Sequence, residues 1–236
     1  NQAKRGNDRP NLVPRRDGAI EKLAAEGLLP AIYFIFSRAG CDAAVGQLMN
    51  SGLRLTTPAE RDALDDIAAR HVASLSDDDL EALGYRSFAE ALRRGVAAHH
   101  AGLLPAFKEA VEEAFIRGLV KVVFATETLA LGINMPARTV VLEKLVKFNG
   151  DAHVDITPGE YTQLTGRAGR RGIDVEGQAG VLWQRNFDPR MVAGLASRRT
   201  YPLRSSFSPT YNMAVNLVGS VGRERARTLL EQSFAQ

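Results

Sequence analysis

The densest group of functional side chains in this sequence lies from Gln163 to Gly172, where three arginines are interleaved with three glycines. Arginine carries a permanently charged, forked guanidinium that suits phosphate oxygens, and glycine lets the backbone approach a ligand closely. Arg167 and Arg170 could therefore stabilise charge on a phosphoryl group in transfer, which is the arginine-finger role. For this segment alone, a basic turn that binds any polyanion is the alternative.

Three further segments follow short apolar runs of the kind that form buried strands. Ser37 and Arg38 follow the run 31–36, Gly102 follows the extended stretch 96–100, and Thr126 follows the run 120–125. Because α/β sheets bind ligands at the carboxyl ends of their strands, we expect all four segments at one edge of a sheet. A nucleotide and a polyanion could be held together there. Taken alone, the Thr126 segment could equally be an ordinary strand-to-helix turn.

The same sequence argues against a metal site. Cys41 is its only cysteine. His99 and His100 are adjacent and should point to opposite sides of an extended chain, so they suit a shared metal poorly. His71 lies on the apolar stripe of a predicted helix, where we expect a packing histidine. The carboxylates of Asp77–Asp79 are typical of a helix N-terminus.

Alternating strands and helices must position these segments. The strands are predicted at 31–36, 96–100, 120–125, 138–142 and 180–183, with helices at 40–49, from 57, from 76, at 105–117 and from 157. Thr57 with Glu60, and Thr157 with Glu160, have the capping-box spacing, each with a proline at the first helical position. This alternation predicts an α/β fold, an open parallel sheet with helices on both faces.

The chain divides into three predicted regions. Residues 1–16 mix Asn, Pro, Gly and charge, which predicts a linker or disordered tail. Residues 17–188 hold the α/β domain, and within it the Asn149-Gly150 turn predicts a β-hairpin between Lys144 and Ile156. Residues 189–236 predict a connector and the start of another domain, a short helical C-terminal extension with helices from about Pro209 and Arg223.

Composition fits a globular protein in a reducing setting. The 236 residues are 45% apolar, enough for a sizeable core, and no apolar run approaches the length of a membrane span. A single cysteine excludes an internal disulfide framework, so a cytoplasmic location is expected. The net charge of +3 owes most to basic residues among the first 16, and it says little about function.

In their order and content, the four segments resemble the second RecA-like domain of superfamily 2 helicases, and within it the Ski-like DExH-box group. Residues 34–38 resemble motif IV, 99–103 motif IVa, 125–136 motif V and 163–172 motif VI. The resemblance runs from about Ala31 to Trp183 and looks closest to the large actinobacterial Ski-like helicases. It continues more faintly into 203–216, which resembles the entry to a winged-helix domain. The implied fold is a RecA-like open parallel sheet with a β-hairpin insertion.

This resemblance implies a role for each matched residue. In the nucleotide site, Arg167 and Arg170 would reach the γ-phosphate of ATP, Gln163 would lie nearby, and Gly132 and Asn134 would lie against the sugar. The backbone of a single strand would be held by Ser37, Arg38, Gly102 and Thr126. The strand-separating hairpin would contain Phe148, Asn149 and Gly150; Phe148 could stack on a base or on its own strand. Other groups carry an aspartate where this chain has Asn134, so the sugar contact is the weaker inference.

The sequence contains neither a G-x-x-x-x-G-K-[ST] phosphate loop nor an Asp-Glu-x-His motif. The resemblance therefore implies an ATP-dependent helicase in which ATP and Mg²⁺ are bound jointly with a first RecA-like domain of the same protein, so that this chain alone is inactive. The expected substrate is single-stranded or tailed duplex nucleic acid, RNA or DNA, and no membrane partner is expected. A non-catalytic RecA-like nucleic-acid-binding or interaction module is the alternative, and a double-stranded-DNA translocase is a subtype of the first reading.

Overall fold

Two compact units, 1–197 and 198–236, make up the chain in a computed structural model. The structure describes residues 14–130, 135–184, 188–197 and 210–231. In the second unit, α9 (Tyr211–Val221) and α10 (Arg223–Glu231) pack against each other, and Thr210 caps α9 through its side chain. No helix among the described residues is both long enough and apolar enough to cross a membrane.

A five-stranded parallel sheet organises the first unit. Its strands stand in the order β2, β3, β1, β4 and β7, with β1 in the centre. The bounds are β1 (Ala31–Phe34), β2 (Val96–His99), β3 (Val122–Ala125), β4 (Thr139–Leu142) and β7 (Gln178–Val181). All four neighbouring pairs are parallel, as the alternation of strands and helices predicts. The predicted RecA-like α/β fold is confirmed.

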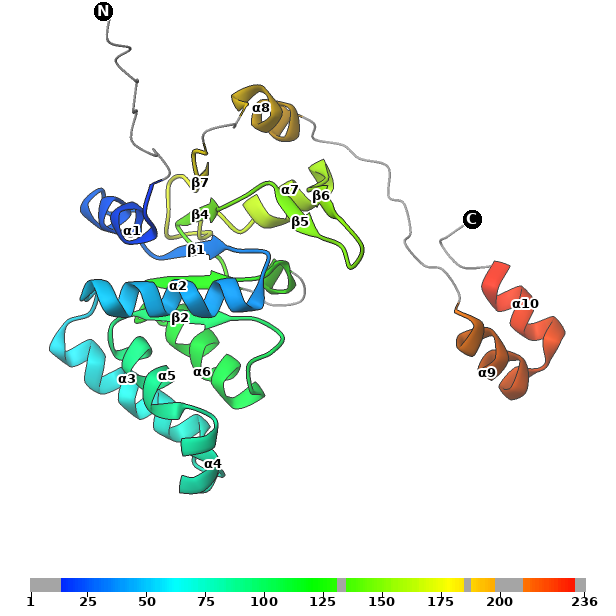
Figure 1. Ribbon diagram of the computed structural model, residues 1–236, viewed down its shortest axis with the longest axis horizontal. Coiled ribbons are helices and arrows are strands. Elements are labelled where there is room, and N and C mark those ends of the chain that lie inside the picture. Colours follow the sequence, from blue (N-terminus) through cyan, green and yellow to red (C-terminus); the bar gives the residue numbers. More distant parts are fainter. Residues whose placement is uncertain (1–13, 131–134, 185–187, 198–209, 232–236) are drawn as a thin grey trace, which may run out of the picture. The chain divides into compact units, whose positions relative to one another are not determined.

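Helices cover both faces of this sheet (Figure 1). One face carries α1 (Arg16–Ala25) and α2 (Arg38–Ser51), which bury Ile20 and Leu48 against it. The other face carries α3 (Pro58–His71), α5 (Tyr85–Arg93), α6 (Pro105–Ile116) and α7 (Pro158–Thr165). The short helix α4 (Asp77–Ala82) contacts α5, and Ser76 caps it as its sequence predicts.

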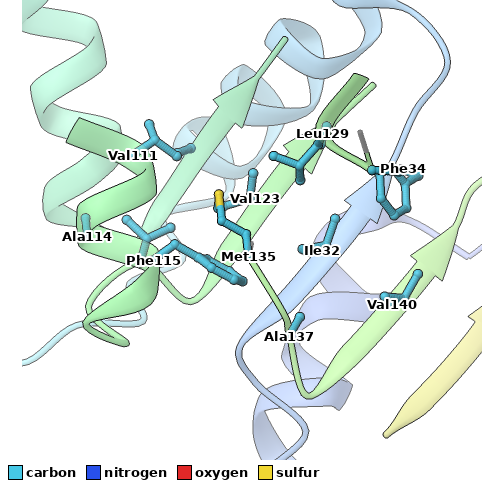
Figure 2. Packing of buried hydrophobic residues seen from close by; sticks show 14 of the residues in the cluster. Ile32, Phe34, Val111, Ala114, Phe115, Val123, Leu129, Met135, Ala137 and Val140 are labelled. Atoms are coloured by element: carbon cyan, nitrogen blue, oxygen red, sulfur yellow. The ribbon is translucent and has the colours of Figure 1, made fainter. Parts of the chain in front are cut away.

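A hydrophobic core lies on each face of the sheet, and side chains that alternate along the strands contribute to both. Ile32 and Phe34 of β1 pack on the face of α3 and α6, while Tyr33 packs on the face of α2. Figure 2 shows the first of these cores, in which Met135 and Phe115 lie near Val123. These strands are buried on both faces, which is why their sequences are continuously apolar.

A two-stranded antiparallel ribbon, β5 (Val146–Phe148) with β6 (His153–Asp155), forms the predicted hairpin. It follows β4 directly and extends away from the sheet (Figure 1). Asn149 Oδ1 accepts backbone hydrogen bonds from Asp151 and Ala152, at 3.0 and 2.9 Å, and Gly150 has φ +111°. These features form the tight turn that the Asn-Gly pair predicts.

Three predictions about the elements need correction. The last strand begins at Gln178 rather than Gly180 and is mostly exposed, because it pairs only with β4 among the described strands. Helix α5 was not predicted. Helix α8 (Pro189–Ser197) occupies a stretch predicted as a connector, and Val192 and Leu195 pack on the first unit's core. The boundary predicted after Asp188 stays a prediction.

Candidate nucleotide and nucleic-acid site

The arginine-rich turn lies at the amino end of the sheet. Ala137, two residues before β4, donates its backbone N–H to the carbonyl of Arg167 at 2.9 Å and accepts one from Gly169 at 2.7 Å. The prediction that all four segments share the carboxyl edge was therefore wrong for the turn that carries Arg167 and Gly169, whereas Gln163 on the preceding helix lies beside residues that follow β3 and β4. The other three do follow the carboxyl ends of β1, β2 and β3.

Helix α7 explains this displacement. It starts near the carboxyl edge, where the Ile156 N–H donates to Leu145 O at 2.8 Å, and Thr157 and Glu160 form the predicted capping box. Its eight residues advance the chain by about 12 Å, nearly the length of a four-residue strand. The helix therefore returns the chain to the opposite edge before the arginines begin.

Close backbone packing holds the turn in place. A Cβ at Gly177 would come within 2.4 Å of the Ala168 carbonyl carbon and of the Gly169 nitrogen. Gly169 itself has φ +90°, a conformation that other residues rarely adopt. Two glycines thus let the arginine turn cross the segment that leads into β7. Gly177 was not predicted from the sequence, since nothing in its local pattern marks a long-range contact.

Arg170 is bound within the domain by Asp174. Its Nε and Nη2 donate to the two carboxylate oxygens at 2.8 Å each, and its backbone N–H donates to Oδ2 at 2.9 Å. The Asp174 side chain is only 3% exposed. Hydrogen bonding from Arg170 lowers the pKa of Asp174 to about 2. The carboxylate is therefore ionised at neutral pH, and it fixes the fork of Arg170 in one orientation.

Arg167 joins the turn to the segment after β3. Its Nη2 donates to the carbonyl of Ala130, the last residue of the 3₁₀ turn η1 (Glu127–Ala130). Gln163 lines a cavity of about 140 Å³ with Ala130 and Glu160, between η1 and α7. The structure thus brings Gln163 and Arg167 together beside η1. Gly132 and Asn134, predicted to contact the sugar, lie outside the described residues.

At the carboxyl edge, Arg38 and Gly102 come together. A Cβ at Gly102 would lie 3.4 Å from Cδ of Arg38 and 3.1 Å from Nδ1 of His100. The Gly102 N–H donates to that same Nδ1 at 3.1 Å, so the Nε2 of neutral His100 carries the proton and donates to Asp42 at 3.0 Å. Ser37 caps α2 by accepting from the Gly40 N–H. Exposed Ser37, Arg38 and Gly102 therefore surround one part of this edge.

His99, the last residue of β2, and His100 point to opposite sides of the chain, as predicted. His100 pairs with Asp42 on α2, and His99 donates toward Glu112 on α6 at 2.7 Å, so the two rings serve opposite faces of the sheet. Burial lowers the pKa of His99, although Glu112 opposes the shift. His71 is half-buried and lies 2.9 Å from Glu113 of α6. No cluster of three potential metal ligands occurs within the described ranges.

Thr126 is nearly buried, at 7% exposure. Its hydroxyl lies 2.9 Å from that of Thr128, and its N–H donates to the carbonyl of His99 at 3.4 Å. The residue thus links the ends of β2 and β3 at the carboxyl edge. In this state its hydroxyl is bonded to Thr128. A contact between Thr126 and a nucleic-acid strand stays a prediction.

A cavity of about 550 Å³ separates the hairpin from the end of β1. Its lining includes Ser37, Lys144, Lys147, Phe148, His153 and Gln184. Phe148 is 55% exposed, and its ring centre lies 5.5 Å from that of His153 across the ribbon. Lys147 is paired with Glu160 and Glu143 also lines the cavity, so Lys144 and the two rings beside Ser37 are what this surface offers to a phosphodiester chain and its bases. Lys144, Lys147 and His153 were not predicted as part of the site.

The donor set fits the phosphates of a nucleotide, and it does not supply a metal site. Arg167 and Arg170 carry guanidinium forks, which in this state bind Ala130 and Asp174, and no group of three potential metal ligands occurs in the described part of the chain. A divalent ion bound to the same nucleotide would take its protein ligands from elsewhere. Asp174, the strongest partner of Arg170, was missed in the sequence, although its i,i+4 spacing from Arg170 was a usable signal.

Comparisons with known proteins agree with this geometry. The model of the helicase conserved C-terminal domain matches residues 71–172. A probable helicase HelY of Mycobacterium tuberculosis (strain ATCC 25618 / H37Rv) is 63% identical over 99% of this chain and 26% of its own length. The chloroplastic DExH-box ATP-dependent RNA helicase DExH15 of Arabidopsis thaliana is 41% identical over 96% of this chain and 20% of its own. Human Superkiller complex protein 2 is 40% identical over 92% and 17%.

The chain therefore spans about a quarter or less of the length of these relatives. The matched domain model covers the segments from His71 through the arginine turn. Strands β2, β3 and β4, the hairpin after β4 and the arginine turn after α7 all lie within the matched residues. Residues 71–172 thus match the helicase conserved C-terminal domain, and nearly the whole chain is similar to one segment of Ski-like DExH-box helicases.

Proposed function

We propose that this chain is the second motor domain of an ATP-dependent nucleic-acid helicase, which supplies two arginines to ATP and a surface to a single strand. The observation that carries the proposal is the joining of Arg167 to Ala130: one hydrogen bond links the arginine turn to the segment that leaves β3. A change at the nucleotide can therefore reach Thr126 and the carboxyl edge through four residues of backbone.

Two groups of residues divide the work. At the amino end, Arg167 and Arg170 would stabilise the charge that develops on the γ-phosphate, while Gln163 contacts the same nucleotide. ATP arrives with Mg²⁺, whose charge offsets that of the phosphates, and a separate RecA-like domain provides the phosphate loop. At the carboxyl end, Arg38 would pair with a phosphodiester, and exposed Gly102, which has no side chain, would let the nucleic-acid backbone approach closely.

Movement of the strand follows from the separation of these groups. Closing of the two motor domains on ATP would bring the arginine turn in, and reopening after hydrolysis would displace the carboxyl edge relative to the other domain. Phe148, at the exposed start of the hairpin turn, would hold the duplex junction by stacking. Names of the relatives include ATP-dependent RNA helicases, so RNA is the substrate to test first. A cytoplasmic setting is part of the same proposal.

The decisive experiment uses Arg170→Ala in the longer helicase. Turnover stimulated by nucleic acid should fall by at least about 10³-fold, because the transition state loses a guanidinium, while strand binding is retained. Arg171→Ala is the matched control: Arg171 is an exposed neighbour on the same turn and should be near wild type. Normal turnover in Arg170→Ala would instead favour a non-catalytic nucleic-acid-binding module.

A second experiment on the same longer helicase identifies the class of nucleic acid that it acts on. Matched RNA and DNA single strands, at one fixed salt concentration, should be compared as activators of ATP hydrolysis. Stronger activation by RNA would assign the 2′-hydroxyl a role in recognition. Activation by duplex DNA alone, with no response to either single strand, would point to the translocase subtype.

A further inference from the structure

In the open domain the guanidinium of Arg170 is bound to Asp174. Three hydrogen bonds hold the pair, two from the guanidinium and one from the Arg170 backbone N–H. Only the two side-chain bonds must break when the guanidinium turns outward, since the backbone bond can stay. The Asp174 carboxylate would then keep its position with its principal counter-charge removed.

Release of Arg170 would leave that carboxylate without its counter-charge. With Arg170 in place, the Asp174 side chain is 3% exposed, against 23% for that of Arg170. A carboxylate that loses its ion-pair partner is destabilised unless water or another cation replaces that partner. Release without an unpaired carboxylate therefore requires water or a second cation near Asp174.

Arg138 meets this requirement. It directly follows Ala137, the residue that holds the arginine turn, and its own carbonyl accepts the N–H of Gln178 at 2.9 Å. Its Nε atom is buried and has no hydrogen-bond partner among the described residues. After Arg170, the charge of Arg138 is the other one that lowers the pKa of Asp174. A buried donor without a partner thus lies close enough to Asp174 for its charge to act on that carboxylate.

We propose that Asp174 is a positioning residue that holds Arg170 ready in the open domain, and that Arg138 takes over the carboxylate when Arg170 turns to the nucleotide. This exchange rests on the arginine-finger role proposed above. The exchange keeps the free-energy cost of releasing Arg170 small, because one ion pair of Asp174 replaces another. Neither Asp174 nor Arg138 touches the reacting atoms.

A double-mutant cycle in the longer helicase tests the exchange. Arg138→Gln leaves both backbone hydrogen bonds of residue 138 in place and should lower kcat by at least roughly tenfold, about 1.4 kcal/mol of barrier, with KM for ATP unchanged. Asp174→Asn removes the carboxylate and should lower kcat only a few-fold. In the double variant no buried charge remains to be compensated, so kcat should return to the Asp174→Asn value.

The outcomes separate this exchange from other readings. A double variant as slow as the product of the two single effects would overturn it. Arg138→Lys keeps the charge and should stay within a few-fold of wild type; a folded Lys variant as slow as the Gln variant would also overturn it. The denaturation midpoint of each variant identifies any that lose activity by unfolding, and the Lys variant then decides alone. If Arg170→Ala turns over normally, the proposed function itself fails, and that result is independent of the cycle.

Discussion

Gly177 offers the sharpest test of how the arginine turn is built. A Cβ at this position would lie 2.4 Å from the Gly169 nitrogen and 2.4 and 2.5 Å from the Ala168 carbonyl carbon and oxygen. All three are backbone atoms of the turn that carries the arginines, so no side chain can rotate away. The backbone of 168–169 or of 177 would have to move by about 1 Å to restore ordinary carbon contacts of at least about 3.5 Å.

Gly180→Ala is the matched control, since a Cβ there meets no atom within 4 Å. Alanine at an unstrained position stabilises by about 0.4–1 kcal/mol through the unfolded chain, whereas overpacking costs about 1–3 kcal/mol. The gain through the unfolded chain is common to both variants, so we expect Gly177→Ala to be less stable than Gly180→Ala by the overpacking cost of about 1–3 kcal/mol.

Urea denaturation of both variants measures the difference, and the slope with denaturant should stay the same. In the longer helicase, Gly177→Ala should also lower ATP turnover, because the displaced turn carries Arg170. Equal stabilities for the two alanine variants would refute the close crossing of the two segments. If ATP turnover were normal as well, the position of Arg170 would not depend on a glycine at residue 177.

Three further predictions follow from particular contacts. Thr57→Ala removes the hydroxyl that accepts from the Glu60 N–H at 3.3 Å and should cost about 1 kcal/mol; an unchanged denaturation midpoint would contradict the capping box. The pKa of Asp174, lowered from 3.8 to about 2 by Arg170, means that its stabilisation is complete above about pH 4 and is lost as pH falls toward 2. The stability difference between wild type and Asp174→Asn should therefore shrink between pH 5 and pH 2.5, and a constant difference would refute it. Phe148→Ala, at a ring that is 55% exposed, should change stability by less than about 0.5 kcal/mol and should reduce unwinding more than ATP hydrolysis; equal losses would assign the ring to the fold.

Local rules in the sequence were sufficient for most elements. Thr57 and Thr157 place their helices through a device of four residues, and the apolar runs place β1 and β3 because strands buried on both faces need no polar side. Sequence patterns were insufficient where the fold depends on distant contacts. The last strand was predicted from Gly180 onward, but its first two residues, Gln178 and Ala179, are exposed and give no strand signal.

The site divides in the same way. Residue types and their order identified Arg167, Arg170, Arg38 and Gly102, since the chemistry of each is local. Their grouping depends on how long α7 is and which way it runs, and this placed the arginine turn at the amino end of the sheet. Asp174 and Arg138 were missed for a related reason: a carboxylate and an arginine near a turn look like ordinary surface charges until their burial is known.

Ala137 spends both of its backbone hydrogen bonds on the arginine turn, and the next two N–H groups, of Arg138 and Thr139, donate to Pro30 beside β1. The arginine turn therefore continues the hydrogen bonding of the sheet at β4, next to the central strand β1. A pull on the guanidiniums therefore stretches hydrogen bonds of the sheet rather than bending a loop. Such a connection is stiff. In the proposed function, a displacement of the arginine turn at the nucleotide would therefore be passed with little loss to the carboxyl edge of the sheet, where the nucleic acid is held.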